Sequence, residues 1–235
     1  MLSSKENILE ERSLLPSTKN YTSWPTVNNL DGDKTAIISL SHQTENRPVQ
    51  LPEANAVNIM TRDCWSARET RKTDHMVTPV NFVFIHHTAM SRCYNHHDSC
   101  EEMKRIQDLH MDGRGWDDIA YNFVISEEGQ VYEGRGWDRV GAHTKSWNDV
   151  AIAICIMGNF VDKEPDSAAK STLKNLLEFG VRLGKISADY TLHGHRDVRD
   201  TACPGDKLYN FIKSLSHFDQ NKPHNPKYPN QNLPV

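Results

Sequence analysis

The stretch Val80-Asn81-Phe82-Val83-Phe84-Ile85-His86-His87 decides how the rest of the chain folds around it. Apolar, β-branched and aromatic side chains fill this stretch, as is typical of a strand buried inside a sheet. Its last two residues are histidines, and functional side chains often lie where such strands end. The stretch therefore predicts a buried strand that carries part of a site.

Further strands are predicted on the C-terminal side of this stretch. Residues 150–157 form the most apolar run and predict the central strand. Residues 120–125 and 131–133 predict a hairpin around a turn at 127–130. Residues 190–192 predict a short strand that leads into a histidine-rich segment.

Three helices are predicted between and after these strands. A capping box at Ser99 and Glu102 indicates the start of the first. Leucines at helical spacing predict the second over residues 167–183, and Pro204 suits the first position of the third. The inner face of the first helix carries Met103, Ile106, Leu109 and His110. The combined pattern predicts an α/β fold, with a mixed central β-sheet flanked by helices.

The composition divides the 235 residues into three parts. Residues 1–55 are rich in polar side chains and lack sustained periodicity, which predicts a disordered arm. Residues 56–218 contain the predicted strands and helices and have the size of one domain. Residues 219–235 combine prolines with polar residues and predict a flexible tail.

Charge and targeting signals exclude several classes of function. The net charge of -4 gives no electrostatic basis for binding nucleic acid or an anionic membrane. No apolar run is long enough to cross a bilayer, and the N-terminal residues do not form a signal peptide. These features predict a cytoplasmic protein, with secretion as the alternative.

Histidines and one cysteine indicate a metal site. His193, His195 and Cys203 lie close together in the sequence and offer the ligand types that zinc prefers. Three protein ligands and one open position make a catalytic zinc site. Because side chains alternate between the faces of a strand, we expect one histidine of each pair, His86 or His87 and His193 or His195, to join Cys203. In the alternative interpretation, these histidines are surface or core residues and the cysteine is a buried thiol.

A series of short motifs occurs in order along residues 58–218. They are Ile85-His86-His87-Thr88-Ala89, Trp116-Asp117-Asp118-Ile119-Ala120-Tyr121-Asn122-Phe123, Val131-Tyr132-Glu133-Gly134-Arg135-Gly136-Trp137, Gly141-Ala142-His143, Gly158-Asn159-Phe160, Gly194-His195-Arg196-Asp197 and Cys203-Pro204-Gly205. Together they closely resemble the peptidoglycan recognition proteins of animals. These proteins share their fold with bacteriophage type 2 N-acetylmuramoyl-L-alanine amidases, so the resemblance implies that fold.

The resemblance also implies the roles of particular residues. Catalytic members of the family hold one zinc ion, and the matching ligands here are His86, His195 and Cys203. The resemblance implies that Tyr121 and Thr201 belong to the catalytic site. Members that only sense peptidoglycan commonly carry serine in place of the cysteine. Cys203 therefore favours an enzyme, and the alternative function is a peptidoglycan receptor that signals through partners.

The implied reaction is hydrolysis of the amide between the lactyl group of N-acetylmuramic acid and L-alanine in bacterial peptidoglycan. Zinc would activate water and polarise the carbonyl group, and the Tyr121 hydroxyl would stabilise the oxyanion. In this family, both the amidases and the receptors act in innate immunity.

Substrate specificity is implied by Gly115, Trp116 and Arg135. In this family a Gly-Trp pair with that arginine accompanies binding of diaminopimelate-type stems, whose extra carboxylate a guanidinium can hold in a bidentate fork. Alternatively, Arg135 is a surface charge and Trp116 a packing residue. We also assign His143 and His87 to the substrate groove. The alternatives are a structural histidine for His143 and, for His87, a ring that faces away from the metal.

The five cysteines leave at least one outside any intramolecular disulfide. Cys93 and Cys100 flank a polar loop and match a short-loop disulfide of the family. Such a bond suits an oxidising compartment, which conflicts with the cytoplasmic prediction. Cys155 is expected to be a small buried apolar side chain, and Cys64 has no clear partner.

Overall fold

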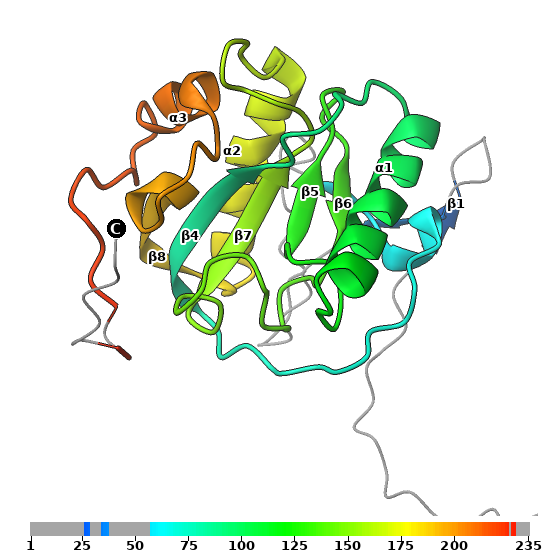
Figure 1. The fold of residues 1–235 in the computed structure, drawn as a ribbon, viewed down its shortest axis with the longest axis horizontal. Helices are drawn as coiled ribbons and strands as arrows, with labels where there is room; N and C mark the ends of the chain where they lie inside the picture. Colours follow the sequence, from blue (N-terminus) through cyan, green and yellow to red (C-terminus); the bar gives the residue numbers. More distant parts are fainter. Residues whose placement is uncertain (1–25, 29–33, 38–56, 226, 229–235) are drawn as a thin grey trace, which may run out of the picture.

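The computed structural model describes residues 26–28, 34–37, 57–225 and 227–228. Over these residues, a mixed β-sheet has helices on both of its faces, as the sequence predicts (Figure 1). Strands β4 (Val80–His87) and β7 (Ala151–Ile156) lie side by side inside the sheet and run parallel. Both coincide with the apolar runs that predicted them. Their register pairs His86 with Cys155, so the two residues lie next to each other near the carboxyl ends of the strands.

The remaining strands extend this pair in both directions. Within the described residues the sheet has eight strands in the order β1-β2-β3-β6-β5-β7-β4-β8. Strand β8 (Ile186–Gly194) pairs parallel with β4, and β5 (Phe123–Ile125) pairs parallel with β7. Strand β6 (Val131–Glu133) returns antiparallel to β5 and forms the predicted hairpin. Strand β3 (Asn58–Met60) then pairs parallel with β6.

Two strands differ in length from the prediction. Strand β5 begins at Phe123 rather than at residue 120, because the Asn122 side chain replaces part of the ladder by accepting the backbone N–H of Ala153. Strand β8 begins at Ile186 rather than at residue 190, because its pairing with β4 continues past a register shift. Residues 186–189 alternate between apolar and polar side chains, which is a weak strand pattern over so few positions.

Helices α1 (His96–Asp108) and α2 (Ser167–Arg182) pack against opposite faces of the sheet. Helix α2 follows the prediction closely, and its buried leucines join the larger core cluster with the inward side chains of β4 and β7. Helix α1 contributes Met103 and Ile106 to a second cluster on the other face. Apolar core therefore lies on both faces of the sheet.

Helix α1 begins one turn earlier than the sequence predicts. Asn95 caps the helix, since its side-chain oxygen accepts the backbone N–H of Asp98 at 2.9 Å. The predicted capping box at Ser99 was therefore wrong, and Ser99 lies buried inside the helix. Leu109, expected on the inner face, is 47% exposed because the helix ends at Asp108 and continues as the π-turn η3 (Leu109–Gly113).

Helix α3 (Asp206–Ile212) also differs from its prediction at the start. Pro204 precedes the helix instead of occupying its first position, because Gly205 is the N-cap with a φ of 91°. Leu208 and Ile212 pack into the same core cluster as α2. Two short 3-10 turns complete the described elements: η2 (Arg62–Trp65) and η4 (His195–Asp197).

Parts of the predicted arm and tail contact the domain. Strands β1 (Thr26–Asn28) and β2 (Lys34–Ile37) lie within residues 1–55 and pair antiparallel next to β3, whereas the rest of that segment lies outside the described residues. In the predicted tail, the Asn225 side chain donates to the carbonyl of Ser146, and Lys227 pairs with Asp149. These contacts bring residues 225 and 227 against the loop that precedes β7.

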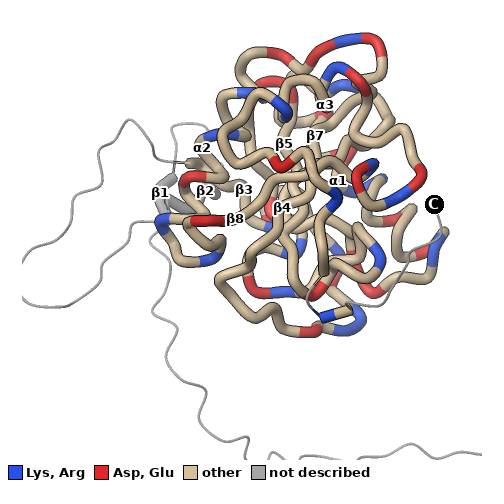
Figure 2. Tube along the Cα trace, turned by 90° about the vertical axis from the view of Figure 1, so that its left-hand side faces the viewer, with Lys and Arg blue, Asp and Glu red and all other residues tan. Residues whose placement is uncertain are grey.

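Basic and acidic residues are interspersed along the described part of the chain (Figure 2). Among the described residues, every helix is too short or too polar to span a bilayer.

Candidate metal centre

His86, His195 and Cys203 meet at the carboxyl ends of β4 and β8. Their potential ligand atoms all lie within 4.8 Å of one another, and His86 Nδ1 is 3.7 Å from Cys203 Sγ. In the part of the chain that the structure describes, no other group of three or more histidine, cysteine or acidic residues could hold a metal in this way. The sequence-predicted ligands are therefore the residues that converge.

Each of the three residues is positioned by a different element. His86 extends from β4, and His195 opens the turn η4 directly after β8. Cys203 comes from the following loop, where its backbone N–H donates to Thr201 Oγ1 at 3.2 Å and its carbonyl accepts the N–H of Arg196 at 3.1 Å. The thiol also accepts the backbone N–H of His87 at 3.5 Å. Thr201 thus holds the cysteine loop in place.

The two histidine pairs are separated for different reasons. His87 faces away from His86, and its Nδ1 accepts the backbone N–H of Phe160, as alternation along a strand requires. Alternation along a strand does not separate His193 from His195, because residues two apart in a strand point to the same face. The expectation that only one of them joins the site rested on alternation, and that reason was wrong. His193 is fully buried beside Thr191 within β8, whereas His195 lies beyond the end of the strand.

Burial controls the protonation of the converging groups. Burial, and secondarily the neighbouring His195 and His143, lower the pKa of His86 well below its ordinary value. Burial and then Arg199 lower the pKa of His195 to about 4. Burial raises the pKa of the Cys203 thiol to about 12, although the His87 N–H and Arg196 act in the opposite direction. Both imidazoles are therefore neutral at pH 7 and keep a lone pair for a cation.

These donors fit a zinc ion. Bond lengths of about 2.0–2.3 Å in tetrahedral geometry place neighbouring ligand atoms about 3.3–3.8 Å apart. The 3.7 Å between His86 Nδ1 and Cys203 Sγ lies within that range. The positive charge of a metal would convert the buried thiol to a thiolate, which burial alone opposes. Two neutral imidazoles and one thiolate would hold the ion and would leave it open to water or substrate.

Tyr121 connects this centre to the predicted specificity residues. Its ring lies 5.4 Å from that of His86 and 5.6 Å from that of His110, and the His110 ring lies 5.0 Å from Trp116. Burial and then the neighbouring Cys155 and Cys203 thiols raise the pKa of the Tyr121 phenol well above its ordinary value. The phenol is therefore protonated at neutral pH and can donate a hydrogen bond.

His110 was predicted only as a packing residue of a helix. It is buried, and its Nδ1 accepts the backbone N–H of Ala120 at 3.0 Å, so it fixes the chain just before Tyr121. Gly115 has a φ of 71°, which favours glycine at the turn into Trp116. Nothing in the local sequence distinguished this role of His110 from ordinary packing.

Arg135 is buried, and three backbone carbonyls accept hydrogen bonds from its guanidinium. It is 9% exposed, and its side chain donates to the carbonyls of Ile119 at 2.7 Å, Val140 at 2.8 Å and Asp118 at 3.4 Å. These bonds use the Nε hydrogen and one hydrogen on each terminal nitrogen. A guanidinium has five such hydrogens, so one remains on each terminal nitrogen. The side chain is thus held rigidly with two donors left.

His143 lies beside the centre, and the residue after it was not singled out from the sequence. The His143 ring is 5.5 Å from that of His86, and burial lowers its pKa to about 3. Thr144 Oγ1 lies 2.9 Å from His143 Nδ1 and 3.2 Å from His86 Nε2. Because Thr144 is 58 residues from His86, no local pattern could have predicted this contact.

The implied disulfide between Cys93 and Cys100 is not formed in the structure. Cys93 is a buried free thiol whose Sγ is directed toward the carbonyls of Ser91 and Asp98. The Cys100 sulfur instead lies 3.5 Å from His96 Nε2 and 3.7 Å from the Cys64 carbonyl. The two sulfurs thus have different neighbours. Cys155 is buried, as predicted.

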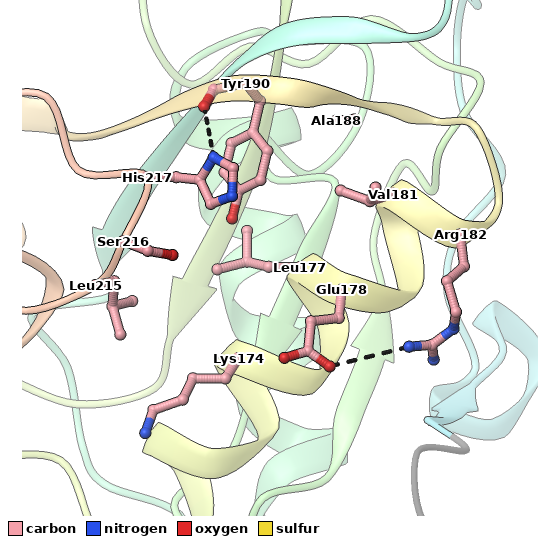
Figure 3. A pocket seen from close by; sticks show the side chains of 10 residues that line it. All are labelled: Lys174, Leu177, Glu178, Val181, Arg182, Ala188, Tyr190, Leu215, Ser216 and His217. Atoms are coloured by element: carbon pink, nitrogen blue, oxygen red, sulfur yellow. Dashed lines mark hydrogen bonds and ion pairs between the residues drawn. The ribbon is translucent and has the colours of Figure 1, made fainter. Parts of the chain in front are cut away.

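A separate hollow lies beside α2 and is not part of this centre. It has a volume of about 450 Å³ and is lined by α2, β8 and residues 215–217 (Figure 3). His217 stacks on Tyr190 with ring centroids 4.1 Å apart, and its Nδ1 lies 3.0 Å from the Tyr190 carbonyl. None of the converging metal donors lines it.

Comparison with known proteins shows that this chain is similar to peptidoglycan recognition proteins. Residues 76–206 match the family model described as "Amidase_2: N-acetylmuramoyl-L-alanine amidase". Peptidoglycan recognition protein 1 of Mus musculus is 46% identical over 162 residues, which cover 68% of this chain and 88% of that protein.

Two solved structures are also similar. Wild-type Drosophila PGRP-LB has a TM-score of 0.68 and 40% identity, covering 68% of this chain and 95% of that one. Peptidoglycan recognition protein-LE, solved in complex with tracheal cytotoxin (monomeric diaminopimelic acid-type peptidoglycan), has a TM-score of 0.68 and 37% identity. That alignment covers 68% of this chain and 95% of the other.

Proposed function

Because this chain belongs to the peptidoglycan recognition protein family, with its N-acetylmuramoyl-L-alanine amidase domain, we propose that it binds bacterial peptidoglycan and hydrolyses it as a zinc-dependent amidase. The observation that carries this proposal is the convergence of His86, His195 and Cys203 within 4.8 Å. The scissile bond joins the lactyl group of N-acetylmuramic acid to L-alanine. Through this activity the protein modulates innate immune responses to bacteria.

Cys203 favours an enzyme over a receptor without catalytic activity. As a thiolate it supplies the only anionic ligand of the three, and an anionic ligand strengthens binding of a divalent cation. A serine hydroxyl at the same place would stay neutral at pH 7 and bind zinc weakly. The backbone N–H of His87 and the Thr201 hydroxyl hold the cysteine and its loop in position before any ion arrives.

The protein's own residues account for the other parts of the reaction. Zinc bound by these ligands would activate water and polarise the scissile carbonyl. The protonated Tyr121 phenol donates a hydrogen bond to the oxygen on which negative charge develops. Its ring lies against those of His86 and His110, so the position of the phenol is fixed before substrate binds.

The preferred substrate carries diaminopimelate in its peptide stem. Arg135 has one further N–H on each terminal nitrogen beyond its three bonds to carbonyls, and a guanidinium can present two such donors to a carboxylate. Diaminopimelate has a carboxylate that lysine lacks. Because three backbone carbonyls already hold the guanidinium, little side-chain entropy is lost when it binds. Trp116 lies at the end of the ring series that leads from Tyr121, so it would contact the same stem.

The proposal is tested by comparing wild type with Cys203→Ser. We expect wild type to bind one zinc ion and to release peptide stems from diaminopimelate-type muropeptides. The variant should lose roughly 1000-fold or more of this activity, because the metal-dependent stabilisation of the transition state is lost. It should still bind the muropeptide, since Arg135 and Trp116 are unchanged. Equal hydrolysis by the two proteins would refute zinc catalysis, and binding without release by wild type would favour a receptor.

A further inference from the structure

The hydroxyl of Thr144 lies between two buried imidazoles. Thr144 Oγ1 is 3.2 Å from His86 Nε2 and 2.9 Å from His143 Nδ1. Thr144 is fully buried, and His86 and His143 are 2% and 8% exposed. Solvent therefore cannot readily replace this hydroxyl as a hydrogen-bond partner, and the three side chains form one chain of hydrogen bonds.

Because the Thr144 hydroxyl carries one proton, this series of hydrogen bonds can run in two directions. In the first, His86 Nε2–H donates to Thr144, which donates to His143 Nδ1. In the second, His143 Nδ1–H donates to Thr144, which donates to His86 Nε2. Only the first direction leaves Nδ1 of His86 without a proton, because a neutral imidazole carries one proton in total. Nδ1 is the atom that faces Cys203 Sγ at 3.7 Å.

The backbone around Thr144 is held independently of any metal. Asn148 Oδ1 accepts the N–H of His143 at 2.9 Å and the N–H of Thr144 at 2.7 Å. The Trp147 N–H donates to the Thr144 carbonyl at 2.8 Å, which closes a tight turn. The Thr144 hydroxyl is therefore presented to His86 from a rigid loop.

We infer that Thr144 is a positioning residue that holds the His86 ring in the tautomer and orientation in which Nδ1 binds zinc. This inference rests on the proposed zinc site, and it gives a role in metal binding to a residue that is not itself a ligand. Partners that accept the second N–H of a metal-bound histidine fix the ring and raise its basicity as a ligand. Threonine is suited to this role because it accepts from one imidazole while it donates to the other.

The test measures zinc affinity of the full chain by competition with a chromophoric chelator. Thr144→Val keeps the shape of the side chain and removes the hydroxyl, and we expect zinc binding to weaken by roughly 10–100-fold. Thr144→Ser restores the hydroxyl and should bind zinc within a few-fold of wild type. Thr191→Val is the matched control, because it removes a hydroxyl 3.0 Å from Nε2 of His193, which is not a ligand. Its zinc affinity should equal that of wild type.

A second measurement uses only the wild-type protein, so it does not require any variant to fold. Nitrogen-15 spectra of the zinc-loaded wild type should show His86 with its proton on Nε2 and the metal on Nδ1. A metal on Nε2, or wild-type zinc affinity in a folded Thr144→Val, would overturn the inference. A wild-type chain that binds no zinc would refute both the zinc site and the role of Thr144. A chain that binds zinc as described but hydrolyses no muropeptide would refute only the amidase proposal.

Discussion

The two faces of the sheet use the same strands for different purposes. On the α2 side, Val83 and Ile85 of β4 join Ile154 of β7 in the larger core cluster. On the α1 side, His86 and Cys155 lie next to each other in register, and both are buried. Because side chains alternate along a strand, one step separates a residue that stabilises the fold from one that is available for chemistry.

This difference teaches that stability and chemistry can be altered separately in this protein. The α2 face is an apolar core of aliphatic and aromatic side chains, where burial of apolar surface is the main contribution to stability. The α1 face carries polar groups near the carboxyl ends of β4 and β7, where Tyr121, His143 and Thr144 surround His86. Changes on the first face should affect unfolding, and changes on the second should affect catalysis and metal binding.

After the loss expected for Cys203→Ser, the next largest effect on catalysis is expected from Tyr121→Phe on the α1 face. Loss of the phenol should lower the rate of muropeptide hydrolysis by roughly 100–1000-fold, because one donor to the developing oxyanion is removed. Zinc content and the thermal midpoint should stay close to wild type. Tyr132→Phe is the matched control, since its hydroxyl contacts His96 rather than the metal centre. Wild-type turnover by Tyr121→Phe would show that this phenol takes no part in the reaction.

Leu176→Ala on the α2 face should affect stability and leave catalysis unchanged. Leu176 is fully buried in the core cluster, and its truncation should lower the free energy of unfolding by about 2–5 kcal/mol. Denaturant titration measures this change. Zinc affinity and the rate per folded molecule should not change. If the folded variant hydrolysed muropeptide more slowly than wild type at a temperature where both are folded, the two faces would not be independent.

The smallest effect is a change in preference, from Arg135→Val. Affinity for diaminopimelate-type stems should fall about 10-fold more than affinity for lysine-type stems, because only the former present the extra carboxylate to the guanidinium. Calorimetry with the two muropeptides measures the difference, and the lysine-type ligand reports any general disturbance of the groove. Equal losses for both ligands would assign Arg135 a structural role through its bonds to Ile119 and Val140.

Local patterns in the sequence determined the elements that lie at the centre of this fold. The apolar runs predicted β4 and β7, and leucine spacing predicted α2, because periodicity and burial are properties of neighbouring residues. The resemblance to a known family supplied the residues His86, His195 and Cys203. Helix starts were less predictable: Asn95 and Ser99 are both good caps, and local sequence does not decide between them.

Which groups of the site contact one another depends on the tertiary fold. His86 contacts Thr144 and Cys203 at separations of 58 and 117 residues, and the register of β4 with β7 and β8 brings these segments together. The three bonds that anchor Arg135 likewise depend on how loops pack. Sequence patterns report the preferences of a few adjacent residues. Contacts between distant residues depend instead on how strands pair and loops close, and those are properties of the whole fold.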